Sequence, residues 1–152
     1  MQLTEQEKTV IKDLQTQEQT CIEKYRFYEN SAKDPQLKNL FHRIGNEEQE
    51  HFDSLAQVLK GEVPNVEAAR SGMEGFSPTT TYEAGDNSEN KRHDQFLCTD
   101  TIATEKLVSG TYNTELFAFG AAAIRRLLNH IQTEEQNHAE MIYKYKTANG
   151  MA

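Results

Sequence analysis

The sequence predicts an all-α protein, and three observations support that prediction. Four long segments repeat apolar residues at spacings of three, four and seven, which is the period of a helix. Hydrophobic residues make up 36% of the 152-residue chain, charged residues 26%, and tryptophan is absent, which is more typical of a helical protein than of a β-sandwich. A long polar stretch divides the four segments into two pairs, so two helical hairpins are expected.

The first hairpin is expected over residues 4–60. Thr4 and Glu7 predict a capping box at the start of its first helix. Asp34 as N-cap and Pro35 at the first helical position predict the start of the second helix. The apolar faces of the two helices are Ile11, Leu14, Ile22 and Tyr25, and then Leu37, Leu40, Phe41, Ile44, Leu55, Val58 and Leu59.

A connection is expected over residues 61–93, since this stretch holds four of the eight glycines, two of the three prolines and no sustained period. The second hairpin is expected over residues 94–147. Its apolar faces are Cys98, Ile102, Val108, Tyr112 and Leu116, and then Ile124, Leu127, Leu128, Ile131, Ile142 and Tyr145. Because about thirty residues are enough to run back along such helices, the prediction is one domain, residues 1–152, folded as an antiparallel four-helix bundle with a long crossover between helices 2 and 3.

Charge and hydropathy exclude several classes of function. The chain has 24 acidic and 16 basic residues and no basic stripe, so a nucleic-acid partner is not expected. The longest apolar run, "LFAFGAAAI", is far shorter than the ~20 residues of a membrane span. The polar start "MQLTEQEKTV" is unlike a signal peptide. Cys21 and Cys98 are interpreted as two reduced thiols of a cytoplasmic protein.

Each of the four apolar faces is interrupted by polar residues at positions where an apolar side chain is expected. The second and fourth helices each carry a Glu-x-x-His motif, which places both side chains on one face of the helix. A layer of carboxylates buried in an apolar core costs several kcal/mol and repels itself unless a cation is present. The predicted metal ligands are Glu18, Glu48, His51, Glu105, Glu135 and His138.

The spacing of these residues indicates a duplicated hairpin. Shifting the chain by 87 residues superposes the two motifs "EEQEH" and "EEQNH", Glu18 on Glu105 and Tyr25 on Tyr112. Two hairpins related by a pseudo-twofold axis would present two facing half-sites, as a dinuclear metal centre requires. Oxygen and nitrogen ligands without thiolate favour iron or manganese, with zinc as a substitute.

Several roles remain open at this point. Either Glu48 with Glu105 or Glu18 with Glu135 is expected to bridge the two metals, and the sequence does not choose between these pairs. Glu47 and Glu134 are interpreted as acids flanking the ligands, with direct ligation as the alternative. For Tyr25 and Tyr112 core packing is favoured, and the alternatives are a hydrogen bond to a ligand or a role in electron transfer. The remaining histidines, His42, His93 and His130, are interpreted as surface or structural residues.

The doubled E…ExxH motif resembles the ferritin-like superfamily of di-metal carboxylate proteins over residues 1–60 and 90–150. Within it, "ATEKLVSGTYNTEL", "RRLLNHIQTEEQNHAEMIYKY" and the terminal "NGM" are similar to the Coat F family of spore coat proteins. One departure is the start of the fourth helix, "FGAAAIRR", which has alanines where the first hairpin has Asp34 and Pro35. The resemblance implies a spore-forming bacterium and association with the spore coat, and the expected location is therefore cytoplasmic and spore-associated.

Two functions follow as expectations. The first is redox chemistry at a dinuclear iron or manganese centre, of the peroxidase, catalase or ferroxidase type, with peroxide, O₂ or ferrous iron as reactant. An electron donor would be a separate protein, because no rubredoxin-like CxxC pair is present. The second is a structural spore coat protein that uses the bundle as a scaffold. Other coat proteins are expected partners in either case, and a homodimer is allowed.

Overall fold

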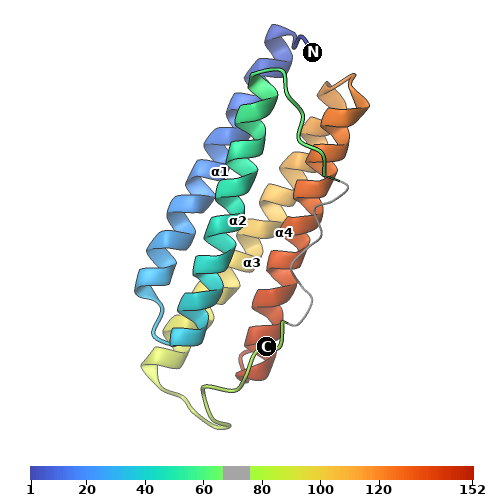
Figure 1. Ribbon diagram of the computed structural model, residues 1–152. Helices are drawn as coiled ribbons and strands as arrows, with labels where there is room; N and C mark the ends of the chain where they lie inside the picture. The colour runs from blue at the N-terminus through green and yellow to red at the C-terminus, as the bar shows by residue number, and fades with distance from the viewer. Residues whose placement is uncertain (67–75) are drawn as a thin grey trace.

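The protein is described here by a computed structural model covering residues 1–66 and 76–152. Its helices are α1 (Glu5–Ser31), α2 (Pro35–Leu59), α3 (Glu89–Glu115) and α4 (Ala122–Ala148), with a short 3-10 turn, η1 (Leu116–Ala118), after α3. The described residues contain no strand. Figure 1 shows four long helices lying along one another, which confirms the predicted all-α bundle.

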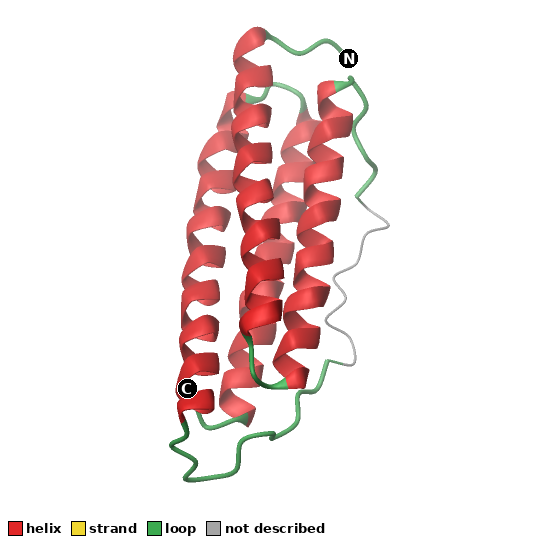
Figure 2. Ribbon diagram, turned by 90° about the vertical axis from the view of Figure 1, so that its left-hand side faces the viewer, coloured by secondary structure: helices red, strands yellow, loops and turns green. Residues whose placement is uncertain are grey.

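The helices pair as two hairpins, α1 with α2 and α3 with α4. The hairpins face each other, so that α1 also contacts α3 and α2 contacts α4. In Figure 2 the turns that join neighbouring helices lie at the two ends of the bundle. The connection from α2 to α3 joins opposite ends of the bundle, as predicted, but its residues 67–75 lie outside the described part of the chain.

The helix starts follow local sequence signals. Thr4 accepts a hydrogen bond from the backbone of Glu7 and forms the predicted capping box, and Asp34 caps α2 ahead of Pro35. The start of α4 has no side-chain cap, as its alanines indicated. The predicted start of α3 was wrong by five residues: α3 begins at Glu89 because Ser88 caps it, and the polar first turn lacks the apolar residues that mark a helix in sequence.

The apolar faces are buried as predicted, except at Leu59, the last residue of α2, and at Ile102 on α3, which are only partly buried. Thr101 occupies the interior position on α3 in place of Ile102. Shifting by 87 residues relates Thr101 to Leu14, which is also buried, so the repeat gives the correct register. The Thr101 hydroxyl is satisfied in the core because it donates to the backbone carbonyls of Leu97 and Cys98.

Buried apolar residues form two clusters, with the interrupted part of each helix between them. On α1, for example, Leu14 belongs to one cluster and Tyr25 to the other, and Glu18 lies between.

A polar network connects the helices at one end of the bundle. The buried Asp94 of α3 accepts hydrogen bonds from the backbone of Lys33 and from the hydroxyl of Tyr82. No helix among the described residues is long and apolar enough to cross a membrane.

Candidate metal centre

The six predicted ligands meet in one layer inside the bundle. Each lies in a helix, where the i, i+3 spacing of the two Glu-x-x-His motifs places glutamate and histidine on the same inward face. No residue of the set is more than 3% exposed, and all four helices contribute to it. The layer consists of Glu18 from α1, Glu48 and His51 from α2, Glu105 from α3, and Glu135 and His138 from α4.

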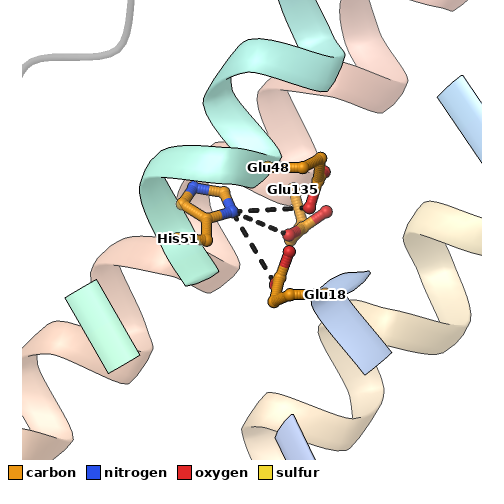
Figure 3. Close-up of side chains that lie close together, drawn as sticks. All are labelled: Glu18, Glu48, His51 and Glu135. Atoms are coloured by element: carbon orange, nitrogen blue, oxygen red, sulfur yellow. Dashed lines mark ion pairs between the residues drawn. The ribbon is translucent and has the colours of Figure 1, made fainter. Parts of the chain in front are cut away.

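The first group of ligand atoms surrounds His51. Figure 3 shows its Nδ1 directed at three carboxylates that come from three different helices. The distances from this nitrogen are 3.8 Å to Glu18, 3.5 Å to Glu48 and 3.3 Å to Glu135. The four residues offer one ligand atom each within 4.8 Å of one another. This spacing is compact enough for all four atoms to surround a single ion.

The second group surrounds His138, on α4, and again combines residues of both hairpins. Its Nδ1 lies 3.0 Å from Glu48, 3.4 Å from Glu105 and 3.7 Å from Glu135. These four residues also bring ligand atoms within 4.8 Å of one another. The imidazole rings of the two histidines are nearly parallel, with centroids 6.0 Å apart. The layer therefore contains two groups of candidate ligands, one around each histidine, and each group is a candidate half-site for one ion.

Two carboxylates are shared between the half-sites. Glu48 directs Oε2 toward His51 and Oε1 toward His138. Glu135 directs Oε1 toward His51 and Oε2 toward His138. Glu48 and Glu135 belong to both groups, whereas Glu18 and Glu105 belong to one each, an arrangement that differs from both pairs expected from sequence, Glu48 with Glu105 and Glu18 with Glu135. The sequence could not decide this because it depends on how the hairpins face each other.

The outer nitrogen of each histidine contacts an acid from the opposite hairpin. His51 Nε2 lies 3.2 Å from Glu134, and His138 Nε2 lies 2.5 Å from Glu47. A carboxylate accepts this hydrogen bond, which leaves Nδ1 of each ring directed at the layer. Glu47 and Glu134 thus flank the candidate ligands, as interpreted from sequence. His130, which the sequence indicated only as a surface or structural residue, also contacts Glu134 at 2.8 Å.

The two buried tyrosines contact candidate ligands across the hairpin interface. Tyr25 donates a 2.5 Å hydrogen bond to Glu105, and Tyr112 donates one of the same length to Glu18. Burial and the charge of Glu105 raise the pKa of Tyr25 well above its ordinary value, so its phenol keeps its proton. The favoured sequence interpretation, core packing alone, was therefore incomplete, and the alternative of a hydrogen bond to a ligand describes the contact.

Burial and mutual repulsion hold protons in this layer. Burial, followed by the charge of Glu48, raises the pKa of Glu18 to about 8. Burial and the charges of Glu105 and Glu48 raise the pKa of Glu135 well above its ordinary value. For His51, burial lowers the pKa, but hydrogen bonds to Glu134 and other carboxylates outweigh it and raise the pKa. These ligands are therefore acids that would release protons on binding a cation.

The chemistry of the unpaired atoms tests whether a cation fits here. Among the described residues, nine buried side-chain polar atoms lack a hydrogen-bond partner, and eight belong to the six candidate ligands. They include Nδ1 of both histidines and both oxygens of the shared acids, Glu48 and Glu135. Buried polar atoms are normally paired, so this concentration of unpaired atoms on six neighbouring side chains is compatible with a site for cations. The residues fit a pair of divalent cations.

The remaining candidate groups lie outside the layer. Cys21 and Cys98 are free and buried, and burial raises the pKa of both thiols, so neither offers a thiolate. His42 pairs with Glu29 on the surface. His93 contacts Ser31 near the turn between α1 and α2.

Comparison with known proteins gives one match. Residues 93–152 match the Coat F domain, and this range includes Glu105, Glu135 and His138. No curated protein and no solved structure matches the chain. Residues 93–152, which hold most of α3 and all of α4, are thus similar to the Coat F domain.

Proposed function

We propose that this protein is a ferritin-like bundle that binds a dinuclear iron or manganese centre and carries out redox chemistry with hydrogen peroxide, O₂ or ferrous iron in association with the bacterial spore coat. One observation carries the proposal: eight unpaired buried polar atoms, all on the six predicted ligands, converge in one layer. Iron and manganese suit this set of carboxylate and imidazole donors, and zinc is an expected substitute.

The candidate ligands would hold the ions in two ways, as acids shared by both half-sites or as acids of one half-site. Glu48 and Glu135 each present one oxygen to each half-site, which suits them to bridge. Glu18 and Glu105 each serve one half-site and are oriented by a tyrosine hydroxyl. Iron or manganese bound there would supply Lewis acidity and reversible changes of oxidation state. The burial of the layer keeps bulk water from the ligands.

The Coat F match supports the biological part of the proposal. It supports an association with the spore coat. Other coat proteins as partners and a cytoplasmic origin are part of the proposal. A structural coat protein, in which the metal only stabilises the bundle, is the second candidate, and the same match favours it. Hydrogen peroxide consumption and ferrous iron oxidation by the metal-loaded protein distinguish the two: turnover supports the first candidate, and a metal-loaded protein without turnover supports the second.

Metal binding itself is tested by removing one shared acid. Metal-free protein is dialysed against manganous ion, and bound metal is measured for the original chain, for Glu48→Ala and for Glu50→Ala. Glu50 is a matched control because it lies on the same helix but is exposed. We expect two ions per chain in the original protein and in the control, and fewer in Glu48→Ala. Unchanged stoichiometry in Glu48→Ala would rule out the assignment.

A further inference from the structure

A cavity of about 350 Å³ opens between α3 and α4 and reaches the candidate metal centre. Two of its lining residues, Glu105 and Glu135, are candidate ligands that are only 2% and 0% exposed, so the layer lies directly behind its floor. The remaining lining residues are Lys106, Ser109, Gln136 and Ala139.

The repeat shows which side chains leave this space open. Shifting by 87 residues relates Ser109 to Ile22 and Ala139 to Phe52. Both counterparts, on α1 and α2, are much larger, and Ile22 is buried. The two half-sites are alike in ligands, yet the positions beside them differ in size. A hydroxymethyl and a methyl group therefore border the layer on the α3–α4 side, where the other hairpin has a branched aliphatic chain and an aromatic ring.

The chemistry of the wall restricts what passes through it. Apart from Glu105 and Glu135, the one charged side chain that lines the cavity is that of Lys106, whose ammonium group repels a divalent cation. Ser109 and Gln136 offer a hydroxyl and an amide, groups that hydrogen-bond small polar molecules. The wall thus suits a small hydrogen-bonding molecule better than a metal ion.

We propose that this cavity is the entrance by which a small hydrogen-bonding reactant, of the size of hydrogen peroxide, reaches the carboxylate layer, and that Ser109 and Ala139 set its width. The inference rests on the proposed function for the identity of the reactant. The existence and width of the entrance, by contrast, are properties of the metal-free chain, so they are tested separately.

The first test measures access in metal-free protein by thiol labelling. In a Cys21→Ser, Cys98→Ser background, the rate of reaction with methyl methanethiosulfonate is compared for Ser109→Cys and for its counterpart Ile22→Cys. We expect the thiol at position 109 to react about tenfold faster or more, because a buried thiol reacts only after local opening. Adding Ala139→Phe should slow the reaction at position 109 by a similar factor. Equal rates at the two positions, or no effect of Ala139→Phe, would overturn the proposal.

The second test measures entry to the metal-loaded protein by stopped-flow spectroscopy with azide, a small ligand for ferric iron. Gln136→Trp fills the cavity, and Gln49→Trp makes the same change at the repeat counterpart on α2. With iron content equal, we expect Gln136→Trp alone to slow azide binding, by about tenfold. Equal rates in the two variants would overturn the entrance. Failure of all variants to hold iron would instead contradict the proposed function, and the labelling rates would still decide whether the entrance exists.

Discussion

The phenol of Tyr25, on α1, donates a 2.5 Å hydrogen bond to the carboxylate of Glu105, on α3. Tyr112, on α3, donates a hydrogen bond of the same length to Glu18, on α1. Each hairpin thus orients a candidate ligand of the other. The histidines follow the same rule, because each contacts a flanking acid of the opposite hairpin. The half-sites are therefore complete only when the two hairpins are docked.

Removing the tyrosine hydroxyl is expected to weaken metal binding without abolishing it. In Tyr25→Phe, Glu105 keeps its position in α3 but loses its orienting donor. The loss of such an outer contact typically lowers metal affinity about 10–100-fold. Titration of metal-free protein with manganous ion measures the change. Tyr145→Phe is the control, since Tyr145 is also buried but donates to Asp34; an equal loss in the control would contradict the role assigned to Tyr25.

Glu47 is expected to act through His138 and not as a ligand. In Glu47→Gln the charge that orients the imidazole is lost, so metal affinity should fall about 10–100-fold while the stoichiometry at saturating metal stays the same. Equilibrium dialysis at several metal concentrations separates affinity from stoichiometry. Loss of one ion per chain at saturation would show that Glu47 binds metal directly.

The stability of the metal-free protein is expected to fall as the pH rises. Burial, then the charge of Glu48, raises the pKa of Glu18 from 4.5 to about 8, so the folded state favours the protonated acid. This contribution to the free energy of unfolding is fully present below pH 4.5 and is lost as the pH rises through about 8. The raised pKa of His51 and of His138 acts in the same direction.

Calorimetric melting of metal-free protein across this pH range measures the effect. The increase in melting temperature on adding metal should grow with pH, because the ligands bind metal in their deprotonated forms. Glu18→Gln should flatten the pH dependence of the metal-free protein. A melting temperature that rises with pH in the absence of metal would contradict the account.

Replacing a shared acid by an apolar side chain is expected to stabilise the metal-free bundle. Glu135 is fully buried beside Glu48 and Glu105, which repel it. Both oxygens of Glu135 are buried without a hydrogen-bond partner, and leaving such a group unpaired typically costs about 1–3 kcal/mol. Glu135→Leu should therefore melt about 2–4 °C higher for each kcal/mol gained, and it should lose the stabilisation by metal. If metal-free Glu135→Leu melted at a lower temperature than the metal-free original protein, Glu135 would not destabilise the metal-free bundle.

The sequence predicted which polar residues form the buried layer because these positions are local features. A carboxylate inside an apolar helical face is visible from the period alone, as at Glu18 between Leu14 and Ile22. The capping box at Thr4 and the start of α2 at Pro35 were predicted for the same reason.

Contacts between the hairpins could not be predicted in the same way. The sharing of Glu48 and Glu135, the pairing of Tyr25 with Glu105 and the approach of His130 to Glu134 depend on the depth and rotation at which the hairpins dock. Helical periods place a residue on a face but do not say which atom of the facing helix it meets. The interior position of Thr101, by contrast, could have been predicted from the sequence. The 87-residue repeat aligns Thr101 with Leu14, which is apolar and buried.

The most direct test of the central claim is elemental analysis of the protein purified without chelators, with iron, manganese and zinc measured per chain. The account predicts two ions per chain, chiefly iron or manganese, held by the six residues of the layer. Absence of all three metals, with no uptake on reconstitution and no gain in melting temperature, would contradict it.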